Sequence, residues 1–293
     1  MTGPAIARTA GIRTCFVTSR AEARDILRRI GTLPDAAIDL AEGALALGAL
    51  ERPQVPLERY RRHLAALARD MADRHSPGDD GLEGRIATLH AVLVQRHGYT
   101  GDTETYDDLQ NANLLRVIDR RRGLPVALGI LYLHAARASG WSMAGLNFPG
   151  HFLVRLDAEG ERAILDPFNG GQVRSAVDLR ELLKATAGTA AELTPDHYAA
   201  VGNRDILLRL QNNRKLRHLS AGEIAQALEV LDTMRLFAPN EAALWRETGL
   251  LEAHRGNPDA AIGALETFLQ LTDDDRQLHQ AATLIQQLRN RLP

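Results

Sequence analysis

Apolar residues recur at helical spacing over most of the chain. Residues 21–72 are rich in Ala, Leu and Arg with the period of amphipathic helices, and Pro34 interrupts them. Residues 85–98 have the same pattern, which ends at Gly98, a residue type common at helix C-caps. From Asp178 onward the pattern is again helical. The chain is therefore expected to be mostly α-helical.

One helix is expected to be central and buried. In the segment RRRGLPVALGILYLHAARASG (120–140), Pro125 is placed near a helix start, where its missing N–H costs nothing. The residues that follow are almost wholly apolar, so this helix has no face suited to solvent. We expect it to form the middle of the core.

Strand-like sequence is confined to one region. FLVRL (152–156) and RAILDPF (162–168) flank the turn sequence DAEGE, which predicts a β-hairpin. QVRSA (172–176) is expected to extend the same sheet. Together with the helices, this pattern predicts an α+β fold, mostly α-helical, with one small antiparallel sheet.

The C-terminal third contains an internal repeat. Three pairs of residues are separated by 34 positions (256 − 222 = 34): Gly222 and Gly256, Ala227 and Ala261, and Leu231 and Leu265. In the second copy, Trp245 and Gly249 stand where a tetratricopeptide repeat packs its first helix on its second. A period of this length in paired helices is the signature of that solenoid. Residues 276–291 are expected to form a helix that caps the last repeat.

His151 and Asp166 lie on the two arms of the predicted hairpin, 15 residues apart (166 − 151 = 15). This spacing suits two antiparallel strands and a short turn, so a hydrogen bond between the two side chains is expected. An imidazole oriented by a carboxylate is two thirds of a nucleophilic-catalysis site. In the alternative, Asp166 orients a buried histidine for structure alone.

Composition narrows the possible functions. The net charge of −2 gives no indication that the protein binds nucleic acid or an anionic membrane. No apolar run approaches the length of a membrane span or of a signal peptide, so a cytoplasmic location is expected. The single cysteine, Cys15, excludes a disulfide framework and a cysteine zinc cage. His90 and His97 share a helix face without a convergent carboxylate, so neither a metal site nor a cofactor is expected.

Three motifs stand out: YDDLQNANLLRVIDRRRGLPVAL (106–128), GLNFPGHFLVR (145–155) and ILDPFNGG (164–171). Together they resemble one bacterial family, the SirB-type transglutaminase-like proteins with C-terminal tetratricopeptide repeats. The resemblance covers nearly the whole chain. It implies a core like that of the cysteine proteases, in which a helix bearing the nucleophile packs on a sheet bearing histidine and aspartate.

The resemblance also implies that the nucleophile is missing. Aligned with the G-x-C motif of active relatives, Gly123 occupies the glycine position and Pro125 the cysteine position. Where relatives often carry a serine two places later, this chain has Ala127. We therefore expect Pro125 to pack against the His151 ring and to lie closer to it than Cys15 does.

Four further residues are candidates for ligand binding: Asn147, Arg121, Arg122 and Phe168. The amide of Asn147 either faces the pocket or pins the NFPG turn. The arginine run 120–122 precedes a helix N-terminus, a position that suits an anion. In the alternative, one arginine is a buried bidentate partner of a carboxylate, with Asp107, Asp108 and Asp119 as candidates, and the other arginines are solvated. Phe168 is one of the aromatic residues expected to close over the pocket.

The chain divides into an N-terminal helical subdomain (21–100), a transglutaminase-like core (101–200) and tetratricopeptide helices (205–293), and residues 21–200 are expected to fold without the repeats. The preferred function is a non-catalytic module that binds a protein or peptide through its degenerate pocket and its repeats. The alternative is a hydrolase of amide, ester or peptide bonds. In it, His151 activates a water while Asp166 fixes the tautomer of the ring. The missing nucleophile favours the first.

Overall fold

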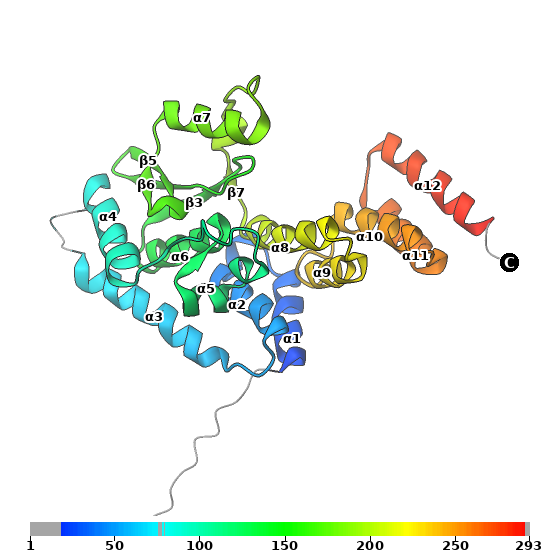
Figure 1. Cartoon of the computed structure of the whole chain (residues 1–293), viewed down its shortest axis with the longest axis horizontal. Coiled ribbons are helices and arrows are strands. Elements are labelled where there is room, and N and C mark those ends of the chain that lie inside the picture. Colours follow the sequence, from blue (N-terminus) through cyan, green and yellow to red (C-terminus); the bar gives the residue numbers. More distant parts are fainter. Residues whose placement is uncertain (1–18, 76–77, 79, 291–293) are drawn as a thin grey trace, which may run out of the picture.

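The computed structural model describes residues 19–75, 78 and 80–290 (Figure 1). Helices α1 (Arg20–Thr32), α2 (Leu40–Glu51) and α3 (Leu57–Arg74) occupy the segment for which the sequence predicts amphipathic helices. Ser19 caps α1 in a reciprocal box with Glu22, because each side chain accepts a hydrogen bond from the backbone N–H of the other. Pro34 lies just beyond the end of α1, as predicted.

The helix predicted over residues 85–98 is present, but it changes from α-helical to π-helical hydrogen bonding along its length. Helix α4 (Leu82–Leu89) continues into a π-helical turn (His90–Arg96), and Gly98 follows with a φ of +71°. Helix α5 (Leu114–Arg120) comes next. On either side of it, the short strands β1 (Thr100–Gly101) and β2 (Arg122–Gly123) pair in parallel.

Helix α6 (Pro125–Ala138) is the central helix, as predicted. Pro125 is its first residue, and residues 125–133 are all buried. Helices α2, α3, α5 and α8 (Asn203–Ser220) contact it, and the sheet covers its remaining side. A Cβ atom at Gly129 would overlap the ring of Phe152, so only glycine lets the sheet approach the helix this closely.

The sheet has five strands in the order β6-β5-β4-β3-β7, and all its pairings are antiparallel. Their bounds are β3 (Ser142–Leu146), β4 (Val154–Ala158), β5 (Glu161–Asp166), β6 (Gln172–Val173) and β7 (Ala200–Val201). A two-residue turn, Glu159–Gly160, joins β4 to β5, and both residues have positive φ, as the tight turns of β-hairpins require. The predicted hairpin is confirmed, but of residues 172–176 only Gln172 and Val173 extend the sheet, because Ser175 already caps helix α7. Helix α7 (Ala176–Ala187) lies over the sheet on the side away from α6 (Figure 1).

The C-terminal helices form an arm that projects from the core (Figure 1). They are α8, α9 (Ile224–Phe237), α10 (Ala242–His254), α11 (Pro258–Leu271) and α12 (Asp275–Arg289). Gly222 and Gly256 follow α8 and α10 with φ of +73° and +78°, so the repeat places the same left-handed turn twice. A Cβ at Gly249 would press against Leu265, which places a small residue where α10 crosses α11. The predicted helical repeat is confirmed.

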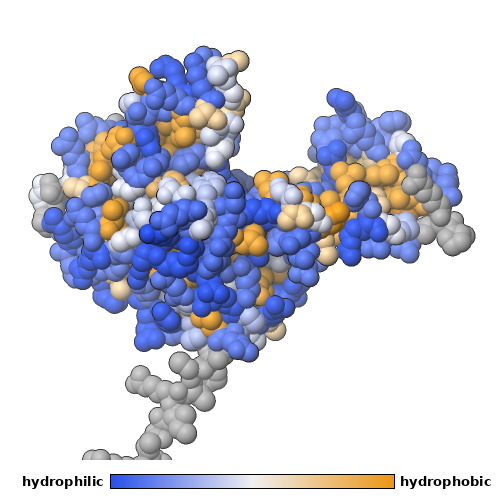
Figure 2. Space-filling view, in the orientation of Figure 1, coloured by the Kyte–Doolittle hydropathy of each residue, from blue (hydrophilic) through white to orange (hydrophobic). Residues whose placement is uncertain are grey.

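The two halves of the arm pack differently. Apolar side chains of α8 and α9 join the main core, among them Leu207, Leu210, Leu231 and Phe237. The helices α11 and α12 instead form a separate cluster, in which Ile285 of α12 packs with Leu265 and Phe268. In the space-filling view, apolar residues gather where the helices of the arm face one another (Figure 2). Folding of residues 21–200 without the repeats stays a prediction, and the contribution of α8 to the core weighs against it.

Candidate functional site

His151 lies in the loop between β3 and β4 rather than on a strand. The ladder of β4 begins at Val154, so the prediction that His151 and Asp166 sit on facing strands is wrong. The loop is held from outside by Arg209 of α8, whose Nη2 donates hydrogen bonds of 2.6 Å to the carbonyl oxygens of Phe148 and His151. The predicted contact is nevertheless present, because His151 Nε2 and Asp166 Oδ1 are 2.9 Å apart.

Asp166 is fully buried at the end of β5 and is surrounded by hydrogen-bond donors. Besides His151, Oδ1 accepts the backbone N–H of Phe168 at 3.1 Å, and Oδ2 accepts the Asn169 side chain at 2.8 Å and Arg174 Nη2 at 2.7 Å. Burial alone would raise the pKa of Asp166, but the hydrogen bonds from His151, Asn169 and Arg174 hold it well below its usual range. Asp166 is therefore a carboxylate at neutral pH.

Asn169 and Arg174 are site residues that the sequence reasoning missed. Asn169 belongs to the one-turn 3-10 helix after β5 (Pro167–Asn169), and Arg174 follows the short strand β6, which pairs back onto β5. The signal for Asn169 was its place in the DPFNGG motif. The signal for Arg174 was weaker, because an arginine after a short strand is ordinarily solvated.

The geometry leaves one nitrogen of the His151 ring unused. Since Asp166 is ionised, Nε2 must be the donor in their hydrogen bond, and neutral imidazole then presents a lone pair at Nδ1. In the part of the chain that the structure describes, Nδ1 has no hydrogen-bond partner. The ring of Phe168 meets the imidazole edge to face at 6.0 Å and meets Tyr106 in the same way at 5.7 Å. Phe168 thus lies between the dyad and an exposed tyrosine.

The first turn of α6 offers no nucleophilic atom. It contains Pro125, Val126 and Ala127, all buried. Two turns further along α6, the hydroxyl of Tyr132 is buried without a hydrogen-bond partner among the described residues. Burial and the nearby charge of Asp166 raise the pKa of Tyr132, so its hydroxyl stays protonated. The packing of Pro125 against His151 stays a prediction, and Cys15 lies outside the described residues.

Of the arginine run, Arg120 is the one that pairs with a buried carboxylate. Its Nη2 donates to Asp102 Oδ2 at 2.6 Å and its Nη1 to Asn111 Oδ1 at 2.8 Å. Although burial opposes it, hydrogen bonds from Thr105 and Arg120 hold the pKa of Asp102 well below its usual range. The alternative is right that one arginine pairs with a carboxylate, but the carboxylate is Asp102 and the pairing uses one guanidinium nitrogen instead of two.

The three carboxylates named from the sequence have other partners. Asp119 accepts hydrogen bonds from Arg52 at 2.7 Å and from the Tyr60 hydroxyl at 2.9 Å. Asp107 lies 3.5 Å from Arg217. Asp108 accepts the Gln110 N–H at 2.9 Å within its own turn. Their assignment to the arginine run is therefore wrong.

Arg121 and Arg122 also have partners within the chain. Arg121 has a left-handed backbone (φ 62°) and directs Nη1 to His63 Nε2 at 2.8 Å and to the Tyr99 hydroxyl. Burial and the Arg121 charge lower the pKa of His63 to about 4, so His63 is neutral and can accept that hydrogen bond. Arg122 pairs with the exposed Glu104 at 3.0 Å. A ligand role for either arginine stays a prediction.

Asn147 faces a groove at the junction of core and arm. Its backbone N–H donates to the Ala199 carbonyl at 2.9 Å, which pins the turn. Its side chain is exposed and helps to line a cavity of about 360 Å³ together with α8 and α10. Neither His151 nor Asp166 lines this groove, so a role for the Asn147 amide in the pocket of the dyad stays a prediction, whereas its backbone N–H does hold the turn.

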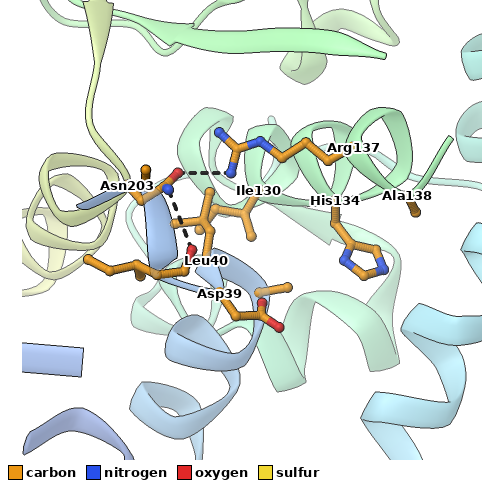
Figure 3. A pocket seen from close by; sticks show the side chains of 10 residues that line it. Asp39, Leu40, Ile130, His134, Arg137, Ala138 and Asn203 are labelled. Carbon is orange, nitrogen blue, oxygen red and sulfur yellow. Dashed lines mark hydrogen bonds between the residues drawn. The ribbon is translucent and has the colours of Figure 1, made fainter. Parts of the chain in front are cut away.

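A second cavity, of about 570 Å³, lies on the other face of α6 (Figure 3). Its lining includes Ile130, His134 and Arg137, and helical periodicity places these opposite to Gly129 and Tyr132, which face the sheet. Arg137 Nη1 donates to Asn203 Oδ1 at 2.8 Å (Figure 3). None of the predicted site residues lines this cavity.

A histidine paired with a carboxylate is by itself not diagnostic in this protein. His97 with Asp70 and His218 with Glu223 are each 2.6 Å apart and lie far from the dyad in the sequence. Among the described residues, no three His, Cys, Asp or Glu side chains are grouped to hold a metal ion. What sets the His151 pair apart is the set of donors around Asp166 and its place next to the 3-10 helix Pro167–Asn169, which contacts the buried helix α6.

Comparison with known proteins places this arrangement in a family. The model of the transglutaminase-like superfamily matches residues 58–212, and a tetratricopeptide repeat model matches residues 215–286. The chain therefore belongs to the transglutaminase-like superfamily and carries tetratricopeptide repeats.

Curated relatives match over most of the chain. The UPF0162 protein of Vibrio cholerae is 32% identical over 240 residues, which cover 82% of this chain and 88% of the relative. The protein SirB1 of Salmonella typhimurium is 24% identical over 213 residues, or 72% of this chain and 77% of the relative. The resemblance to SirB-type proteins is thereby confirmed. No solved structure matches the chain significantly.

The structure also bears on membrane association. Within residues 19–75 and 80–290, no helix is long and apolar enough to cross a bilayer.

Proposed function

We propose that this protein is a non-catalytic member of its superfamily that binds a peptide or protein partner. The observation that carries the proposal is the composition of the first turn of α6, where Pro125, Val126 and Ala127 have neither a thiol nor a hydroxyl. Acyl transfer on this scaffold requires a nucleophile that histidine can activate. The His151–Asp166 pair then orders a binding pocket instead of activating a side chain.

The repeats support a macromolecular partner. Tetratricopeptide helices stack into curved surfaces that present side chains to extended ligands. Here α8 and α10 present polar and apolar side chains toward the core, and the surface is hollowed between the lobe that carries α7 and the projecting arm (Figure 2). The cytoplasmic location expected from composition stays a prediction.

The alternative function is hydrolysis by an activated water. It is favoured by Nδ1 of His151, which has no hydrogen-bond partner among the described residues, and by Asp166, which would fix the tautomer of a general base. No covalent intermediate is needed in this scheme. Nδ1 takes a proton from water as the oxygen attacks the carbonyl carbon, and it then gives this proton to the leaving amine or alcohol as the C–N or C–O bond breaks, which restores the neutral ring.

One experiment separates the two functions. The purified full-length protein is screened against chromogenic amide, ester and peptide substrates, and turnover is compared between the wild type and His151→Ala. The control is His279→Ala, a histidine on α12 at the far end of the arm. We expect no turnover above background in any of the three. Turnover that His151→Ala abolishes and His279→Ala preserves would establish the hydrolase instead.

A further inference from the structure

The cavity of about 570 Å³ on the face of α6 away from the sheet has walls from two parts of the chain (Figure 3). One wall is α6, with Ile130, His134 and Arg137, and the other is the segment 36–41, which leads into α2. Asn203, the first residue of α8, lines it as well. The volume lies within the range typical of small-molecule sites.

The lining combines buried apolar residues with two exposed charges of opposite sign. Six of its ten residues are apolar, and among these Ile38, Leu40 and Ile130 are buried. The charged residues are Asp39 and Arg137, and both are exposed. Figure 3 shows them on opposite walls, Asp39 at the start of α2 and Arg137 on α6. An apolar lining with a few charged or polar groups is typical of sites that orient a small ligand.

Arg137 has no close counter-ion. Within the part of the chain that the structure describes, no carboxylate lies within 4.0 Å of its guanidinium. Nη1 donates to Asn203 Oδ1 at 2.8 Å, while Nε and Nη2 have no partner there. Burial lowers the pKa of Arg137, and the charges of Asp35 and Asp39 act in the opposite direction from a greater distance. The guanidinium stays charged and keeps two donor nitrogens for a ligand.

Asp39 likewise keeps one carboxylate oxygen for a ligand. Oδ1 accepts the backbone N–H of Glu42 at 3.0 Å and so caps α2, whereas Oδ2 has no partner among the described residues. The nearby Asp35 differs, because its carboxylate accepts the backbone N–H groups of Asn203 and Arg204 at 2.8 Å each. Asp39 is therefore the anion that this cavity presents.

The two remaining polar residues of the lining form hydrogen bonds within the fold. His134 Nε2 donates to a backbone carbonyl at 3.1 Å. The Asn203 amide donates to the Asp35 carbonyl at 3.0 Å, and its Oδ1 accepts Arg137. A simple anion or a simple cation would meet one like charge as well as one opposite charge in this cavity. A ligand that carries both charges avoids this conflict.

We propose that the cavity binds a small zwitterion with an apolar body, which is an apolar α-amino acid or a short apolar peptide with both termini free. Arg137 receives the carboxylate, because its planar guanidinium presents paired N–H donors. Asp39 receives the ammonium group. The apolar body lies against Ile38, Leu40 and Ile130, where it is removed from water. This site is separate from the dyad and does not depend on the function proposed above.

The test uses L-leucine and L-leucyl-L-leucine as probes, together with the N-acetyl and C-terminal amide form of each. Binding to the full-length wild-type protein is measured by isothermal titration calorimetry at neutral pH. We expect at least one of the two free zwitterions to bind, and which one binds decides between amino acid and peptide. Either blocking group should weaken binding by about tenfold or more, as expected for loss of a charged hydrogen-bonding group. Glycine and glycyl-glycine, which lack the apolar body, should bind more weakly than the leucine compounds.

Two variants assign each charge to its wall. Arg137→Gln should abolish the preference for a free carboxylate and retain the preference for a free ammonium group. Asp39→Asn should do the reverse, and it should fold because asparagine also caps helices well. Asp274→Asn is the control, because Asp274 caps α12 in the same way but lies outside the cavity. It should bind as the wild type does.

Three results would overturn the proposal. The first is that neither leucine nor leucyl-leucine binds. The second is that the blocked forms bind as tightly as the free zwitterions. The third is that a folded Arg137→Gln or Asp39→Asn variant keeps the preference that it should lose. If a variant does not fold, the comparison of free and blocked ligands on the wild-type protein still decides.

Discussion

The sheet side of the dyad site carries a full set of hydrogen-bonded polar groups, whereas the helix side carries only apolar side chains. On the sheet side, Asp166 accepts hydrogen bonds from His151, Asn169 and Arg174 and is fully buried. On the helix side, the first turn of α6 presents Pro125 and Ala127, which offer packing surface and no reactive atom. A buried carboxylate with this many donors keeps each of those donors paired, which is a structural role, so the presence of the His–Asp pair does not by itself imply catalysis.

The largest effect should come from the sheet side. Asp166→Ala leaves Arg174 and the His151 ring without their acceptor in a buried position, and we expect a loss of about 3–5 kcal/mol in the free energy of unfolding. Urea denaturation followed by circular dichroism measures it. Glu104→Ala is the control, because that carboxylate pairs with Arg122 on the surface and should contribute less than about 1 kcal/mol. Similar losses in both variants would show that Asp166 is not the structural centre of the site.

A cysteine introduced on the helix side tests whether Pro125 occupies the nucleophile position. In a Cys15→Ser background, Pro125→Cys would place a thiol at the N-terminus of α6 and, if the alignment is right, beside His151. Helix dipole and imidazolium lower a thiol pKa, so alkylation by iodoacetamide at pH 6 should be on the order of a hundredfold faster than for an ordinary cysteine. Val126→Cys, one residue along the same turn, is the control. If the two thiols react equally slowly, Pro125 is not at the nucleophile position.

The contact between the two sides can be tested at Gly129. Since a Cβ there would overlap the Phe152 ring, Gly129→Ala should destabilise the fold by about 1–3 kcal/mol even though alanine favours helix. Thermal unfolding gives the size of the effect. Gly263→Ala on α11, where a Cβ would meet nothing within 4 Å, is the control and should be neutral or stabilising. A stabilising Gly129→Ala would mean that sheet and helix are further apart than described.

The smallest effect concerns pH. The folded-state pKa of Asp166 is lowered, so its contribution to stability is present above the unfolded-state pKa of about 3.9 and is lost as the pH falls towards the folded value. His151→Ala removes the first of the interactions that lower this pKa. Acid unfolding of His151→Ala should therefore begin at a higher pH than that of the wild type, while stability at pH 7 falls by only about 1–2 kcal/mol. Parallel acid transitions, measured by tryptophan fluorescence, would contradict a role for His151 in stabilising the carboxylate.

Local sequence patterns were sufficient to predict much of the architecture. The central helix that begins at Pro125, the β4–β5 hairpin and the repeated glycines at 222 and 256 are all encoded in short stretches, because helical period, turn chemistry and repeat length act between near neighbours. The hydrogen bond between His151 and Asp166 could be predicted for the same reason, although the loop position of His151 could not.

Tertiary structure alone decided which charges meet. The pairing of Arg120 with Asp102 and the anchoring of the His151 loop by Arg209 join residues from different elements, the latter 58 positions apart in the chain. Arginine side chains are long and can reach several acceptors, so spacing in the sequence does not select among them. The close packing of α5, α8 and the sheet around α6 makes that selection. It also leaves Arg209 without a counter-ion among residues 19–75 and 80–290, a feature that cannot be predicted from residue types or their order.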